Sequence, residues 1–109
     1  MITTDDITKI NYDITQDGRV LSHNMIESAL SAYRYYDTIE EQIVSIFRGI
    51  VKNHGFRDGN KRTGLIVFLT LCEENDISVN KSDEELVKLT IDIAKNNYSV
   101  EEITNKVFK

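Results

Sequence analysis

Apolar residues recur along most of the chain at steps of three and four, the spacing that places side chains on one face of an α-helix. The first segment begins at Thr4 and carries an isoleucine at three such positions, Ile7, Ile10 and Ile14. It ends in a polar loop, Thr15 to Ser22, which contains an Asp-Gly pair. This pattern predicts a short first helix.

Four further helix starts are indicated by a Ser, Thr or Asn followed three residues later by a glutamate. This arrangement is typical of a capping box, in which the two side chains bond each other's backbone N–H. The four pairs are Asn24 with Glu27, Thr38 with Glu41, Ser82 with Glu85, and Ser99 with Glu102. Apolar residues at helical spacing follow each pair, and the stripe after Thr38 ends close to His54.

One more segment is apolar on every side: GLIVFLTLC, from Gly64 to Cys72. A helix of this kind belongs at the centre of a fold, and we expect it to begin around Asn60. The predicted fold class is therefore all-α, a compact bundle of five to six helices around one buried central helix. The aromatic segment Tyr33 to Asp37 is expected to form a short turn or a small exposed hairpin.

Composition narrows the class of protein. A chain of 109 residues with 40% hydrophobic and 28% charged residues is expected to form a single domain, residues 1–109. The longest apolar stretch is too short for a membrane span, and the N-terminus lacks the layout of a signal peptide. The only cysteine, Cys72, cannot form an internal disulfide. These features favour a cytoplasmic protein without membrane partners.

The charge is unevenly distributed. A net charge of −5 disfavours direct binding of nucleic acid or of an anionic membrane. Residues 48–62, however, hold five basic residues and one acid, Asp58, a local charge of +4 that leaves −9 for the other residues. Such a basic island beside a helix start favours a compact anion such as phosphate. The alternative is that these are solvated charges on two helix ends.

The stretch HGFRDGNKR, residues 54–62, joins two predicted helices through a glycine-containing loop. The free N–H groups at the start of the second helix and its dipole form an anion site, which Gly59 lets a ligand approach closely. Lys61 and Arg62 add charge. A unit charge pair 4 Å apart gains about 4 kcal/mol at an effective dielectric of 20, so these two cations dominate the attraction.

The other polar residues of the stretch each have two interpretations. Asp58 could hold Mg²⁺ between its carboxylate and a phosphate, or cap the helix. Asn60 could likewise cap the helix or donate its amide to a phosphate oxygen. His54 could take a proton from an incoming hydroxyl as a general base, or be a partly buried residue capping its own helix. Phe56 is interpreted as a core anchor of the loop.

These residues carry a resemblance to a known family. HGFRDGNKRT, residues 54–63, resembles the signature HxFx(D/E)GN(G/K)R of Fic/Doc proteins, and MIESAL before it and SDEEL after it resemble the Doc-type (death-on-curing) subgroup. The resemblance implies the helical Fic fold. It also implies an enzyme that transfers a phosphate-containing group from a nucleotide to a protein hydroxyl.

The resemblance also implies roles at matching positions. His54 would be the general base, Asp58 the Mg²⁺ ligand, and Gly59, Asn60 and Arg62 the phosphate cradle. ATP and Mg²⁺ would be the co-substrate and the metal. The aromatic segment Arg34 to Asp37 lies where the family is expected to have its flap, an extended piece that aligns the target polypeptide by main-chain pairing.

Two positions indicate the subclass. AMP-transferring members have a glycine at the position of Lys61 and a second arginine at that of Leu65, whereas Doc-type members share the lysine and lack that arginine. The resemblance therefore favours transfer of the terminal phosphate of ATP to a Ser or Thr of a target such as a translation factor. The alternatives are AMP transfer to a protein hydroxyl and a non-catalytic interaction module.

Regulation is expected from another chain. Doc-type proteins are toxins paired with an antitoxin whose flexible tail folds onto them, so the resemblance implies an antitoxin as a second partner. The string TLCEEN, residues 70–75, fits the inhibitory pattern (S/T)xxxE(G/N) of AMP-transferring members. It follows the signature within the same predicted helix, and we therefore interpret the match as a coincidence.

Overall fold

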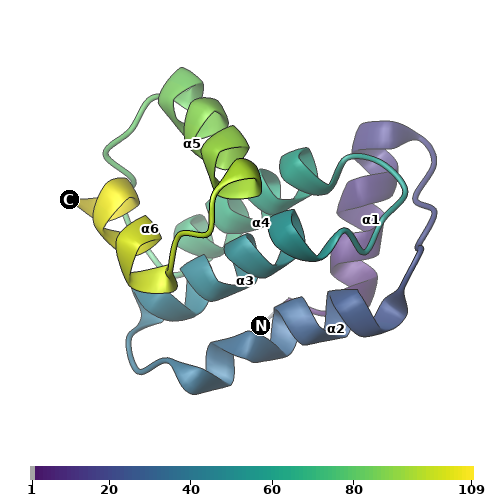
Figure 1. Cartoon of the computed structure of the whole chain (residues 1–109), viewed down its shortest axis with the longest axis horizontal. Coiled ribbons are helices and arrows are strands. Elements are labelled where there is room, and N and C mark those ends of the chain that lie inside the picture. Colours follow the sequence, from purple (N-terminus) through teal and green to yellow (C-terminus); the bar gives the residue numbers. More distant parts are fainter. Residues whose placement is uncertain (1) are drawn as a thin grey trace.

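The computed structural model describes residues 2–109, and these residues form six α-helices and one short 3₁₀ helix (Figure 1). The elements are α1 (Thr4–Thr15), α2 (His23–Ser31), η1 (Ala32–Tyr35), α3 (Ile39–Asn53), α4 (Asn60–Glu74), α5 (Asp83–Lys95) and α6 (Val100–Phe108). The all-α prediction is confirmed. None of the helices in the described residues is long and apolar enough to cross a membrane.

Three of the predicted helix starts are confirmed at the level of single hydrogen bonds. The side chains of Thr38, Ser82 and Ser99 each accept a bond from the backbone N–H three residues later. At Ser82 and Ser99 the glutamate also bonds back to the N-cap, which completes the capping box. These bonds satisfy N–H groups that have no partner inside the helix, so short polar signals locate the helix starts well.

The predicted start of the second helix at Asn24 is wrong. The N-cap is Ser22, whose hydroxyl accepts the N–H of Met25 at 3.2 Å, and Asn24 lies inside the first turn. The reason is a contact far along the chain, because the N–H groups of Leu21 and Ser22 both donate to the carbonyl of Gly55. The chain is thereby held extended up to Ser22, and the helix begins directly after it.

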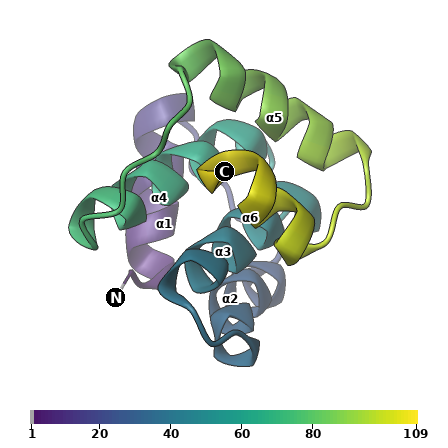
Figure 2. The same ribbon diagram turned by 90° about the vertical axis from the view of Figure 1, so that its left-hand side faces the viewer.

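The core is centred on α3 rather than on α4 alone. Helix α3 packs against α2, η1, α4, α5 and α6, whereas α4 packs against α1, α3 and α5 (Figure 2). Phe47 of α3 meets Phe68 of α4 with ring centroids 4.8 Å apart. Six residues of α4 are buried, but the helix is not covered on every side, since Ile66 is 40% exposed. A chain this short has too few elements to enclose two neighbouring helices completely.

The aromatic segment forms a 3₁₀ helix and not a hairpin, and it lies at the start of α3. A helix of 15 residues is about 22 Å long, and the loop containing His54 follows the other end of α3. The segment Arg34 to Asp37 is therefore far from that loop, and its assignment as the flap is wrong. The rigid length of α3 separates the two regions, which a sequence pattern does not reveal.

Cys72 is a buried free thiol of the core. Burial raises the pKa of its thiol to about 12, so it stays neutral at physiological pH and is a weak nucleophile. The structure thus agrees with its interpretation as an ordinary buried cysteine.

The crossing of α2 and α3 gives a first prediction, on stability. A Cβ added to Gly49 would lie 2.7 Å from the Cα and Cβ of Ala29, and under 3.0 Å something must shift. We expect Gly49→Ala to lower the free energy of unfolding by about 1–3 kcal/mol, as overpacking does. This loss exceeds the helix propensity of alanine, which is more favourable than that of glycine by about 1 kcal/mol. Urea unfolding measures the change.

The exposed Ser28→Ala on α2 is the control for Gly49→Ala, with an expected change within about 0.5 kcal/mol. A Gly49→Ala protein as stable as the wild type, or more so, would contradict the close approach of the two helices.

Candidate functional site

The loop between α3 and α4 contains most of the residues that the sequence predicts as functional. Figure 1 shows it beside α1, with the connection from α1 to α2 close by. His54 follows the end of α3 in the left-handed conformation, at φ 50° and ψ 48°. His54 occupies the C-cap position of α3, as the alternative interpretation expected, but its side chain is exposed and makes no hydrogen bond within the described residues, so the expected partial burial is wrong. The imidazole is open to an incoming group.

Asn60 closes the loop. Its side-chain amide donates to the carbonyl of Phe56 at 2.9 Å, and its side-chain oxygen accepts the N–H of the same residue at 3.0 Å. The side chain of Phe56 is buried, as predicted for an anchor. Asn60 therefore neither caps the helix nor offers its full amide to a ligand, because one of its two N–H groups is already used. Its side chain fixes the shape of the loop.

The loop is also held by main-chain pairing with the chain before α2. Val20 and Phe56 form an isolated antiparallel bridge, and the N–H of Arg57 donates to the carbonyl of Arg19 at 3.0 Å. The carbonyl of Gly55 accepts the two bonds from the N-terminal side of α2 described above. An extended segment, residues 19–22, thus lies directly beside the loop.

The start of α4 presents unpaired backbone donors. The first intrahelical bond runs from the N–H of Thr63 to the carbonyl of Gly59 at 2.8 Å, and within the described residues no acceptor meets the N–H of Asn60, Lys61 or Arg62. Gly59 is the N-cap, with φ 78° and ψ 17°, a left-handed conformation that glycine adopts readily. Three open N–H groups at a helix N-terminus form an anion site.

Asp58 precedes this helix start and is not its cap. Its Oδ1 accepts the N–H of Gly59 at 2.8 Å, and its Oδ2 lies 3.5 Å from Nη2 of Arg62. The side chain is 64% exposed, so the carboxylate is accessible to a cation. Because Gly59 occupies the N-cap position, the alternative of Asp58 as the cap is wrong.

This donor set fits Mg²⁺ bound mainly by phosphate oxygens. Within the described residues no group of three or more His, Cys, Asp or Glu side chains could hold a metal ion. Mg²⁺ is commonly bound through one or two carboxylates together with substrate phosphates. A single accessible carboxylate beside an anion site suits that arrangement, in which Asp58 would be the residue that holds the ion.

Four of the five basic residues of the island divide into two groups, and the fifth, Arg57, pairs with Asp17. Arg48 donates through Nε to the carbonyl of Tyr98 at 2.7 Å, and Lys52 donates to the carbonyl of Asn96 at 2.8 Å. These two residues therefore attach α3 to the turn between α5 and α6. The alternative of solvated charges is therefore wrong for these two half-buried residues, although they are not part of an anion site, while Lys61 and Arg62 lie at the start of α4 and are exposed.

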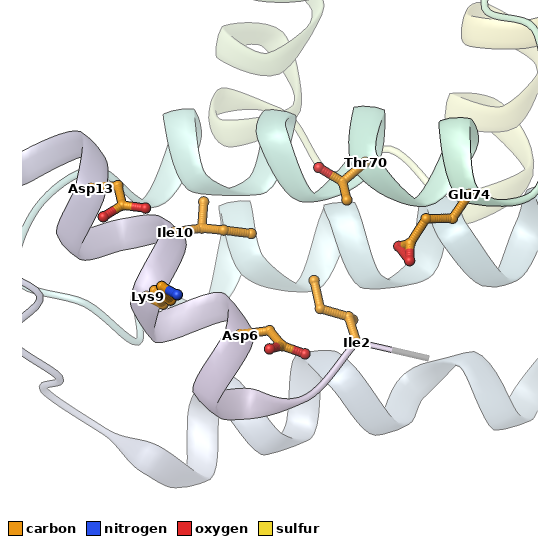
Figure 3. A pocket seen from close by; sticks show the side chains of 7 residues that line it. All are labelled: Ile2, Asp6, Lys9, Ile10, Asp13, Thr70 and Glu74. Atoms are coloured by element: carbon orange, nitrogen blue, oxygen red, sulfur yellow. The ribbon is translucent and has the colours of Figure 1, made fainter.

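A hollow of about 340 Å³ lies at the other end of α4 (Figure 3). Its lining comes from α1, α4 and the chain before α1: Ile2, Asp6, Lys9, Ile10, Asp13, Thr70 and Glu74. Thr70 and Glu74 are two of the three defining residues of the TLCEEN string. Glu74 lies twelve residues after Arg62 on the same helix, about 18 Å along its axis. That separation supports the interpretation of the string as a coincidence.

Sequence reasoning missed Asn11. It is fully buried in α1, and its Nδ2 donates to the carbonyl of Asp58 at 2.7 Å and to Oγ1 of Thr63 at 3.0 Å. A signal was present, since Asn11 stands four residues after the buried Ile7 and so falls in the apolar stripe of α1. A polar residue in such a position is informative because buried amides need partners.

Comparison with known families gives one match. A family model described as the Fic/DOC family matches residues 2–72, a range that holds α1, the extended segment and the whole loop. No protein of curated function matches the chain.

Proposed function

The chain belongs to the Fic/DOC family, and on this premise we propose that it transfers the terminal phosphate of ATP to a Ser or Thr hydroxyl of a target protein. The family consists generally of nucleotide-dependent protein transferases, typically with Mg²⁺. The observation that carries the proposal is the start of α4, where three open N–H groups and two cations stand beside an accessible carboxylate.

The residues of the loop have distinct roles in this proposal. The open N–H groups of Asn60, Lys61 and Arg62 bind the phosphate chain, and the two cations attract its charge. Mg²⁺ held by Asp58 and the phosphates would neutralise charge that develops during transfer. His54 accepts the proton of the target hydroxyl while the oxygen of that hydroxyl forms a bond to the γ-phosphorus. The bond from that phosphorus to the bridging oxygen breaks, and ADP leaves.

Two residues favour phosphate transfer over AMP transfer. Lys61 is exposed in the first turn of α4 and forms no ion pair within the described residues. A long cation at this place adds charge and fills space that a glycine would leave for the α-phosphate. Leu65 is partly buried against the core, so the position where AMP-transferring members have a second arginine cannot bind an anion.

The extended segment beside the loop is the proposed place for the target polypeptide. The N–H and C=O of Val20 bond to no other backbone group of the described residues, while Arg19 and Leu21 pair with the loop. A target strand could therefore add to this edge by main-chain pairing. The segment lies beside His54, whereas the aromatic segment lies at the far end of α3.

The remaining expectations stay proposals that rest on the Doc-type resemblance. They are a toxin role with an antitoxin as second partner, a translation factor as the target, action in the cytoplasm, and a single domain.

Labelled ATP in a cell lysate tests the function. Lysate proteins are incubated with the purified chain and ATP that carries ³²P at either the γ or the α position, and modified proteins are identified by mass spectrometry. We expect label only from the γ position and an added mass of one phosphate on a Ser or Thr. Label from the α position would instead show AMP transfer. Absence of label from both, together with no binding of Mg·ATP, would overturn the enzyme proposal.

A further inference from the structure

Asn11 contacts the loop in a way that its role in the core does not explain. It bonds the carbonyl of Asp58 and the hydroxyl of Thr63, but its own Oδ1 is buried and has no hydrogen-bond partner within the described residues. A buried acceptor without a partner lowers stability. The asparagine is therefore not explained by stability alone, and what it gives the loop is its two N–H donors.

The peptide between Asp58 and Gly59 shows what those donors achieve. A trans peptide is planar, and its C=O and N–H point in opposite directions. Because Asn11 draws the Asp58 carbonyl toward α1, the N–H of Gly59 points the other way, toward the exposed carboxylate of Asp58, which it meets at 2.8 Å. The orientation of this one peptide decides whether a donor or an acceptor faces the carboxylate of Asp58, which lies beside the anion site.

Because residue 59 is a glycine, another residue must fix the orientation of the Asp58–Gly59 peptide. Gly59 adopts φ 78°, and a residue without Cβ visits positive and negative φ almost equally readily. The peptide before it can therefore turn over without steric hindrance from Gly59 itself. A Cβ at this position would lie 2.6 Å from Cγ2 of Thr15 and 3.2 Å from Nδ2 of Asn11, so a larger residue cannot supply the missing constraint.

We propose that Asn11 is a positioning residue that holds the Asp58–Gly59 peptide with its N–H toward the carboxylate of Asp58, beside the anion site, and its carbonyl toward α1. This inference rests on the proposed function for its effect on nucleotide binding. If the peptide turned over, its carbonyl would face the phosphates and repel them. Only the fraction of molecules with the correct orientation would then bind, which weakens the apparent affinity by the same factor.

Two variants isolate the effect. Asn11→Leu keeps a side chain of similar size and removes both donors, whereas Thr63→Val removes only the second acceptor and leaves the bond to the Asp58 carbonyl. The amide signal of Gly59 in a ¹H–¹⁵N NMR spectrum reports the environment of its N–H without any nucleotide. Calorimetric titration with Mg·ATP reports the affinity. Asn11→Ala, which leaves a cavity instead of a misplaced methyl group, replaces the leucine variant if the latter does not fold.

We expect Asn11→Leu to shift the Gly59 amide signal and to raise the Kd for Mg·ATP at least about tenfold, which corresponds to a correct orientation in about a tenth of the molecules. Thr63→Val should leave the signal in place and change the Kd less than about twofold. An unshifted Gly59 amide in the asparagine variants, or an unchanged Kd, would overturn the inference. If the wild type does not bind Mg·ATP, the proposed function fails, and the amide signal alone decides whether Asn11 orients the peptide.

Discussion

Replacing His54 by alanine is expected to reduce the rate of transfer about 10²- to 10⁴-fold, the usual contribution of a positioned general base. The imidazole is exposed at the end of α3 and makes no hydrogen bond within the described residues, so its removal breaks no hydrogen bond. The affinity for Mg·ATP should therefore remain within about twofold of wild type. Incorporation of label from γ-³²P ATP measures the rate, and calorimetry measures the affinity.

The second histidine provides the matched control. His23 is also exposed, in the first turn of α2, and His23→Ala should transfer phosphate within about threefold of the wild-type rate. A His54→Ala protein that transfers phosphate at the wild-type rate would remove His54 from the mechanism.

Replacing Asp58 by asparagine is expected to weaken nucleotide binding when magnesium is present but not when it is absent. With Mg²⁺ present, the Kd for ATP should rise about 100-fold. That factor is about 2.7 kcal/mol, below the roughly 4 kcal/mol that a unit charge pair at 4 Å gains before desolvation. With magnesium chelated, the variant should bind ATP at least as tightly as the wild type. The substitution removes a negative charge beside the phosphates and releases Arg62 from its ion pair.

Asp17→Asn is the matched control for Asp58→Asn, because Asp17 also forms an ion pair with an arginine, lying 3.9 Å from Arg57, whereas Asp58 lies 3.5 Å from Arg62. It should keep the wild-type dependence on Mg²⁺. An Asp58→Asn protein whose affinity responds to magnesium as the wild type does would show that the carboxylate holds no metal.

The helices could be predicted because their determinants are local. A threonine or serine at an N-cap bonds to a backbone group three residues away, so Thr38, Ser82 and Ser99 mark their helices whatever the rest of the chain does. The error at Asn24 shows the limit of this rule. There the boundary is set by bonds between the chain before α2 and Gly55, more than thirty residues away.

The candidate site was predictable in its residue types but not in its contacts. The spacing of the signature locates His54, Asp58 and Gly59, whereas the uses of Arg48 and Lys52 depend on the turn between α5 and α6, more than forty residues further along the chain. The same holds for the flap. The family resemblance placed it in the aromatic segment. The length of α3 separates that segment from the loop, and backbone bonds show that residues 19–22 lie beside the loop instead.

The two hydrogen bonds between Asn60 and Phe56 have a thermodynamic consequence. They join the two ends of the stretch from Phe56 to Asn60 and so restrict the conformational freedom of the loop before a nucleotide would bind. Association then needs little further ordering, and more of the interaction energy appears as affinity. With no segment folding on binding, the heat-capacity change should remain small. In this respect the loop resembles a preformed binding site rather than a segment that folds around its ligand.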